Sequence, residues 1–219
     1  MIIELKNKNT LIVDQFKFRC CIGKNGLTRD KKEGDLKEFW HFGQYVEDDL
    51  ERAKEYPENV NVTELSKFNE VGKETYRMLE KTAKYVLRSL AIHLDLEETY
   101  FDNYIHNGNS ILRPIHYPPI INEPKNAVRA AAHGDINLIT LLVGASADGL
   151  EILSKQDEWV AVTSLPEQIV VNVGDMLQRL TNNKLCSTTH RVVNPARQFW
   201  HTSRFSIPFF LHPKASMSL

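Results

Sequence analysis

The chain has 219 residues and a formal net charge of −1, with 42% hydrophobic and 25% charged residues. These values suit a globular domain with a sizeable core, and the near-neutral charge argues against nucleic acid or an acidic membrane surface as a partner. No apolar run reaches the roughly 20 residues of a membrane-spanning helix, and the first residues do not resemble a signal peptide. The 3 cysteines include no C-x-x-C pair, which favours a reducing, cytoplasmic location.

The first half of the sequence predicts mainly helices. Within residues 1–30, two short apolar runs are compatible with strands. Asp35 is suited to cap a helix over residues 36–42, whose aromatic side chains we expect to pack on a sheet. Apolar residues at steps of three and four then predict a long amphipathic helix over residues 63–94. A short helix is expected at residues 97–104.

From Ser110 onwards the hydrophobic pattern changes to short runs separated by turn residues. The runs expected as strands are 111–117, 136–143, 149–153, 159–163, 169–173, 176–180, 186–193 and 204–211. No helical pattern lies between them, which argues against a parallel α/β sheet and favours a sandwich or barrel. We therefore predict a mainly β fold with N-terminal helices. Its parts are a helical and strand layer (1–109), a β core (110–213) and a tail (214–219).

His133 and Asp135 stand at the head of an apolar run, and residues i and i+2 of an extended strand point to the same face. A later strand delivers His190. Two imidazoles and one carboxylate on strands match the facial triad of non-haem Fe(II) oxygenases, which leaves coordination positions open for substrates. An H-x-D pair alone is frequent by chance, so the prediction depends on the third ligand. We expect these three side chains to bind Fe(II).

A second polar pair opens the last expected strand. Arg204 and Ser206 share a face by the same rule, and a guanidinium beside a hydroxyl can hold a carboxylate through charge-assisted hydrogen bonds. Beside an iron site we expect a co-substrate carboxylate there, and a structural ion pair is the alternative. Tyr117 either donates to the same anion or caps the core. In the run 176–180, residues of one parity are expected to line the cavity, with Gln178 either among them or a satisfied interior amide.

Six motifs together resemble the isopenicillin N synthase-like branch of the Fe(II)/2-oxoglutarate-dependent dioxygenases. They are NSILR (109–113), HYPP (116–119), HGDINLIT (133–140), VNVGDMLQRLTN (171–182), STTHRVV (187–193) and RFSIPFF (204–210). The similarity extends from about Asp35 to Pro213. It implies a double-stranded β-helix, or jelly roll, behind a helical layer. Related chains usually extend further at both ends, so it also implies that this chain is shortened.

The resemblance implies roles for the residues singled out above. It assigns Fe(II) to His133, Asp135 and His190, and the far carboxylate of 2-oxoglutarate to Arg204, Ser206 and Tyr117. The expected reaction uses O₂ to hydroxylate, desaturate or cyclise a small molecule, with release of succinate and CO₂. Two alternatives stay open: an isopenicillin N synthase-type oxidase that uses no 2-oxoglutarate, and a catalytically silent metal-binding jelly roll. The oligomeric state is not indicated.

Overall fold

The computed structural model describes residues 34–163, 165 and 167–219. The short strands considered within residues 1–30 fall outside this part of the chain. The strands are β1 (Glu38–Phe39), β2 (Ile111–Leu112), β3 (Ile115–Tyr117), β4 (Ala130–His133), β5 (Ile139–Val143), β6 (Leu150–Leu153), β7 (Trp159–Ala161), β8 (Ile169–Val173), β9 (His190–Val192) and β10 (Arg204–Leu211). The helices are α1 (Leu50–Ala53), α2 (Phe68–His93), α3 (Asp102–Ile105) and α4 (Asp175–Leu180), with a 3₁₀ helix at Arg197–Phe199.

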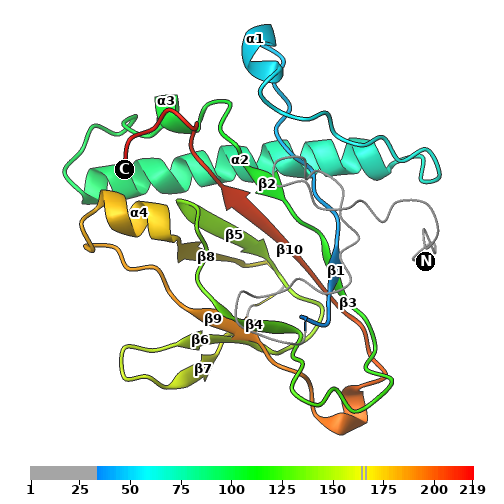
Figure 1. Cartoon of the computed structure of the whole chain (residues 1–219). Helices are drawn as coiled ribbons and strands as arrows, with labels where there is room; N and C mark the ends of the chain where they lie inside the picture. The colour runs from blue at the N-terminus through cyan, green and yellow to red at the C-terminus, as the bar shows by residue number, and fades with distance from the viewer. Residues whose placement is uncertain (1–33, 164, 166) are drawn as a thin grey trace.

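The strands form two antiparallel sheets (Figure 1). The larger sheet has the order β1-β3-β10-β5-β8, and β2 also pairs with β10. The smaller sheet has the order β4-β9-β6-β7. Strands that are distant in sequence are neighbours in space, as β3 and β10 or β4 and β9 are. The expected mainly β fold with a jelly-roll core is therefore confirmed.

The long amphipathic helix is present as α2, although it begins at Phe68 rather than at residue 63. It packs on the larger sheet, against β2, β5 and β10. The side chains that it buries there recur at helical spacing, as Tyr76, Leu79, Ala83, Leu87 and Ala91 do. No helix in the described residues is long and apolar enough to cross a membrane.

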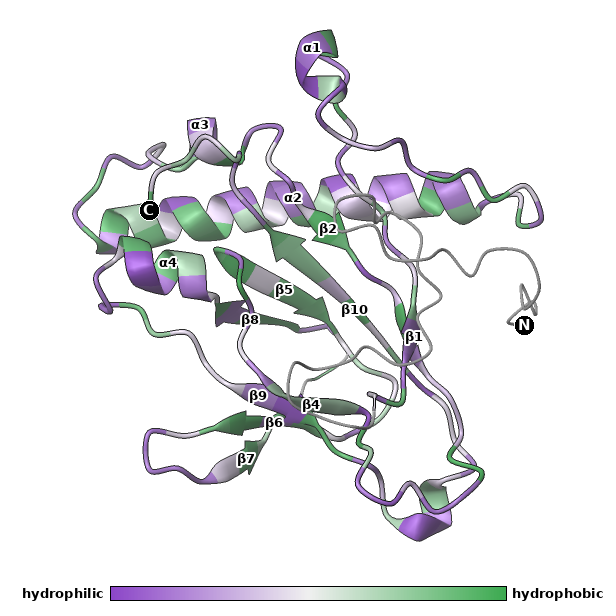
Figure 2. Ribbon diagram, viewed as in Figure 1, coloured by the Kyte–Doolittle hydropathy of each residue, from purple (hydrophilic) through white to green (hydrophobic). Residues whose placement is uncertain are grey.

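Strand β10 separates the helix-facing core from the interior between the sheets. Its odd-numbered residues Ile207, Phe209 and Leu211 belong to the hydrophobic core under α2. Its even-numbered residues Ser206 and Pro208 face the opposite side and line a cavity. The division follows from the period of two along a strand. Figure 2 shows β5 and β10 as mostly hydrophobic, whereas α2 alternates between hydrophilic and hydrophobic residues.

The prediction of a helix at residues 36–42 is wrong, because this segment is extended and contains β1. Glu38 and Phe39 pair with β3, and Phe42 exchanges backbone hydrogen bonds with Leu112. The carboxylate of Asp35 accepts a hydrogen bond from the Ala131 amide at 3.0 Å instead of capping a helix. Aromatic residues favour pleated, half-buried positions, so tertiary pairing outweighs the local cap. The expected packing of these aromatics is confirmed, since Phe42 is buried in the core.

The prediction of a strand at residues 176–180 is also wrong, because these residues form α4. The Gln178 amide donates to the Gly174 carbonyl, and Leu177 is buried in the core. Short apolar runs fit a helix and a strand almost equally well. Gly174 allows the helix to begin here, because a Cβ at this position would lie 2.1 Å from the backbone oxygen of Asn137.

Of the other expected elements, the strands at 169–173 and 204–211 have the expected bounds, and the rest are present with altered bounds. The run 111–117 is divided into β2 and β3 around Pro114, and the run 186–193 contributes only β9. The run 136–143 is strand only from Ile139 onwards. The short helix expected at 97–104 is reduced to α3.

Truncating Phe209 to alanine should destabilise the protein by about 3–5 kcal/mol, as for other fully buried aromatics. The Phe209 ring packs edge-on against Tyr76, with centroids 5.1 Å apart. Phe205 is the matched control, because it lies on the same strand but is 44% exposed and stacks on His116. Truncating Phe205 to alanine should lower the free energy of unfolding clearly less. Denaturant unfolding followed by circular dichroism measures both changes, and equal losses would contradict this placement of the core.

Candidate active site

A cavity of about 90 Å³ lies between the two sheets. Side chains from β3, β4, β5, β6, β8, β9 and β10 line it. All six residues predicted as site residues are among them, namely Tyr117, His133, Asp135, His190, Arg204 and Ser206. The fold thus brings together residues that lie up to 89 positions apart in sequence (117 to 206).

The histidines and the aspartate converge at one end of paired strands. His133 is the last residue of β4 and lies directly opposite His190, the first residue of β9. Asp135 follows in the loop after β4, not within the strand. One potential ligand atom from each residue lies within 4.8 Å of the others, and no other such group of three occurs in the described residues. Atoms bound to one ion at about 2.1 Å lie roughly 3–4 Å apart, so an inward movement of about 1 Å would let the three atoms share a cation.

Both imidazoles are held with one ring nitrogen turned towards backbone carbonyls. His133 Nδ1 lies 2.7 Å from the Ala131 oxygen, and His190 Nδ1 lies 3.1 Å from the Thr188 oxygen. A carbonyl can only accept, so each Nδ1 carries a proton and Nε2 is the nitrogen of each ring that is left to coordinate a metal. Burial, together with the nearby His190, lowers the pKa of His133. The neutral form that coordinates metals is thereby favoured.

The Asp135 carboxylate is buried and oriented by two donors. Its Oδ2 accepts hydrogen bonds from Thr140 Oγ1 at 2.6 Å and from Asn172 Nδ2 at 2.8 Å. Its Oδ1 lies 3.9 Å from His190 Nε2. Neither donor was identified from the sequence, although each is a polar residue within an apolar strand. That interruption of β5 and β8 is the signal that could have revealed them.

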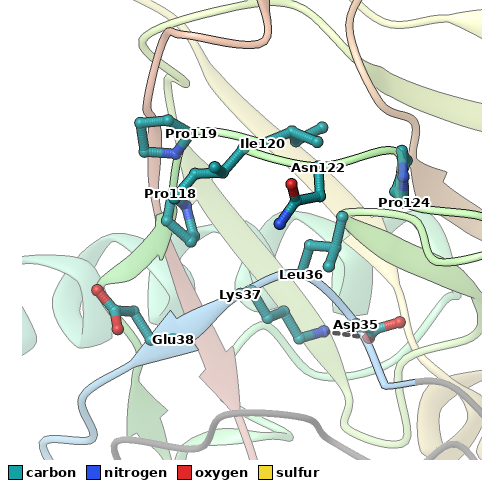
Figure 3. Close-up of a pocket in the computed structure, with 10 residues that line it drawn as sticks. Asp35, Leu36, Lys37, Glu38, Pro118, Pro119, Ile120, Asn122 and Pro124 are labelled. Atoms are coloured by element: carbon teal, nitrogen blue, oxygen red, sulfur yellow. Dashed lines mark ion pairs between the residues drawn. The ribbon is translucent and has the colours of Figure 1, made fainter.

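A short segment before β1 supports the backbone beside His133. The Asp35 carboxylate holds the Ala131 amide, and the Ala131 carbonyl in turn accepts from the His133 ring. Lys37 forms an ion pair with Asp35 at 2.8 Å, as Figure 3 shows. Lys37 lines both the cavity and a neighbouring groove of about 290 Å³, whose other wall includes Pro118.

Arg204 is 1% exposed and lies opposite Tyr117 in the strand register. Its guanidinium carbon lies 5.0 Å from the centre of the Tyr117 ring. Its Nε donates to the carbonyl oxygens of Ala147 and Asp148 at 3.0 and 3.2 Å. Its Nη1 is buried without a hydrogen-bond partner. Within the described residues no carboxylate forms an ion pair with it, so the predicted structural pair is not found there.

This environment leaves Arg204 suited to an anion. Burial lowers the pKa of its guanidinium, which reflects the cost of a charge removed from water. A carboxylate beside Nη1 would offset this cost and satisfy the unpaired donor. Ser206, on the same side of β10 and buried, adds a hydroxyl to the same part of the cavity. The donor set therefore fits one end of a dicarboxylate whose other end reaches the triad.

The residues of α4 do not line the cavity as expected. Gln178 instead accepts a hydrogen bond from the Ser187 amide at 2.5 Å through its side-chain oxygen. It is thus a satisfied amide that links α4 to the loop before β9. The wrong strand assignment led to the wrong side-chain direction.

Comparisons with known proteins agree with this geometry. A 2-oxoglutarate-Fe(II) type oxidoreductase, hxnY, from Emericella nidulans is 36% identical over 152 residues, which are 68% of this chain and 42% of that protein. A solved 2OG-Fe(II) oxygenase family protein from Caulobacter crescentus is 41% identical with a TM-score of 0.78, covering 87% of this chain and 62% of that one. A full-length Neurospora crassa protein, solved with alpha-KG and thymine, is 29% identical with a TM-score of 0.74. The match covers 89% of this chain and 62% of that one.

The chain thus spans less than half of the curated relative and about three-fifths of each solved chain. Strands β2 to β10, which include all those around the cavity, lie within residues 103–213, the range that a family model matches. The model of the 2OG-Fe(II) oxygenase superfamily matches residues 103–213, about half of the chain, and the chain belongs to this superfamily.

Proposed function

We propose that this protein is a non-haem Fe(II)- and 2-oxoglutarate-dependent dioxygenase that oxidises a small molecule by hydroxylation, desaturation or cyclisation. The observation that carries the proposal is a single cavity with two complementary ends. One end has two imidazoles and a carboxylate, and the other has a buried guanidinium with an unpaired donor. A metal ion and a dicarboxylate together would satisfy both.

In this proposal His133, Asp135 and His190 hold Fe(II). When bound, the iron supplies the chemistry that couples conversion of 2-oxoglutarate and O₂ into succinate and CO₂ to oxidation of a C–H bond. The protein orients the ligands through the carbonyl contacts of the imidazoles and the two donors on Asp135. Such outer contacts raise ligand basicity and keep the site in one geometry.

Arg204, Ser206 and Tyr117 hold the far carboxylate of 2-oxoglutarate in this proposal. The two backbone oxygens on Nε fix the guanidinium plane before any ligand arrives. A fixed donor loses little conformational freedom on binding, which favours affinity. Apolar cavity walls such as Leu142 and Ile152 exclude water and strengthen the ionic contacts.

The oxidised substrate is proposed to be a small molecule, in keeping with the relatives. The Neurospora crassa protein was solved with thymine. The near-neutral net charge gives no support for a nucleic acid partner. An exposed free thiol at Cys186 is compatible with a reducing cytoplasm, which we propose as the location.

Turnover tests the function directly. The protein reconstituted with Fe(II) and ascorbate should consume O₂ and release succinate only when 2-oxoglutarate is present, slowly without a substrate and faster with one. Oxygen electrode traces and chromatography of organic acids measure both. Oxygen consumption without 2-oxoglutarate would favour the oxidase, and a metal-loaded protein inert under all conditions would favour the silent jelly roll.

Removing a proposed iron ligand should strongly weaken metal binding. His133→Ala and Asp135→Ala should each weaken binding of Mn(II), a redox-stable probe, by more than about 100-fold in calorimetric titration. Asn172→Ala, which removes only a donor to Asp135, should weaken it by roughly 10–100-fold. His93→Ala, at an exposed position on α2, is the control. Wild-type affinity in either ligand variant would rule out the triad.

Arg204→Leu should raise the 2-oxoglutarate concentration needed for half-maximal succinate formation by about 10–100-fold, because it removes charge-assisted hydrogen bonds worth roughly 1.5–3 kcal/mol each. Mn(II) affinity should stay unchanged. Arg88→Leu is the matched control, since Arg88 pairs with Asp102 at 2.6 Å on the helical layer. An unaltered co-substrate requirement would mean that Arg204 has only a structural role.

A further inference from the structure

A second arginine, Arg129, is as deeply buried as Arg204. Each side chain is 1% exposed, and they are the only arginines among the fully buried side chains of the described residues. Arg129 Nη2 donates to the Thr202 carbonyl at 2.9 Å, and its Nε has no hydrogen-bond partner. Across the described ranges no carboxylate forms an ion pair with it. A buried, unneutralised cation is costly, so its presence calls for a compensating anion.

The contacts of Arg129 place it behind the guanidinium end of the cavity. Thr202, its hydrogen-bond partner, precedes Arg204 by two residues on the chain. Ala130, its neighbour, packs in one cluster with Tyr117, and Arg204 lies over the Tyr117 ring. Arg129 itself does not line the cavity. Any effect on a ligand is therefore through the field of its charge.

Arg129 lies within electrostatic reach of Arg204. Burial, and then the charge of Arg204, lower the pKa of Arg129. Two like charges in a medium of low polarisability repel, and one anion bound close to them relieves the repulsion as well as each cation's lost hydration. Both charges thus favour the same negatively charged group.

We propose that Arg129 is a positioning residue for the co-substrate, whose charge strengthens the hold of Arg204 on the far carboxylate of 2-oxoglutarate. The inference rests on the proposed function. It assigns to the anion end two positive charges, of which only Arg204 touches the ligand. A purely structural Arg129 would instead only tie the start of β4 to the loop before β10 through Thr202.

The test compares 2-oxoglutarate with 2-oxopentanoate, which has the same keto acid end but no far carboxylate. Calorimetric titration into the Mn(II)-loaded protein gives both affinities. Arg129→Met should lower the affinity for 2-oxoglutarate by roughly tenfold and leave the affinity for 2-oxopentanoate unchanged. Arg88→Met is the control and should alter neither. An unchanged ratio of the two affinities in Arg129→Met would overturn the inference.

Two further variants separate the charge from the hydrogen bond and keep the test decisive if Arg129→Met does not fold. Arg129→Lys retains the charge, so it should keep most of the preference for 2-oxoglutarate. Arg129→Gln can still donate to Thr202 but is neutral, so it should lose the preference. The reverse order would show that the hydrogen bond, and not the charge, matters, and would overturn the inference.

The wild-type protein distinguishes failure of the inference from failure of the proposed function. If it binds both keto acids equally well, the far carboxylate is not recognised and the proposed function fails. If it prefers 2-oxoglutarate and Arg129→Gln shows the same preference, only the role of Arg129 is rejected.

Discussion

The site depends on the antiparallel pairing of β4 with β9, which sets His133 directly opposite His190. These two residues are 57 positions apart (133 to 190), yet one register places both imidazoles within ligand distance of Asp135. A shift of one residue would turn one histidine to the other face of the sheet. The chemistry of the cavity is therefore a consequence of strand register, which hydrogen bonds from outside the two strands help to hold.

A second requirement is the balance of charge in a dry interior. The anion end contains the buried guanidinium of Arg204, and the buried Arg129 lies outside the cavity lining, whereas the metal end contains one carboxylate and two imidazoles. Each cationic group is partly satisfied by backbone oxygens, through Ala147 and Asp148 for Arg204 and through Thr202 for Arg129. Neutral dipoles of this kind orient a guanidinium but do not neutralise it. The cavity is thus preorganised for a negatively charged ligand at a cost in the stability of the empty protein.

The site was easier to predict from the sequence than the elements around it. The spacing of His133 and Asp135 and the pair Arg204 and Ser206 follow from the two-residue period of a strand, and all four side chains line the cavity. Asp135 lies just past β4, so the two-residue period predicted that its side chain enters the cavity but did not predict its secondary structure. The fold class was indicated by the change of hydrophobic period after Ser110.

The rest could not be predicted because it depends on partners distant in sequence. Asp35 has the local features of a helix cap, but the Ala131 amide lies 96 residues away. The α4 segment has the pattern of a strand until the approach of Asn137 to Gly174 is known. Arg129 stands beside alanines with no local pattern that distinguishes a buried cation from an exposed one. Such long-range contacts leave no repeating pattern in the sequence, so a single sequence does not reveal them.

The alternation along β10 also affects how this protein can diversify. Pro208 and Phe210 face the cavity, while Ile207 and Phe209 face the helix. Neighbouring residues of this strand therefore contribute separately to the cavity and to the core. A change of substrate preference at an inward position leaves the packing under α2 intact. Selection can therefore explore new specificities on this strand without repeatedly passing through poorly folded intermediates.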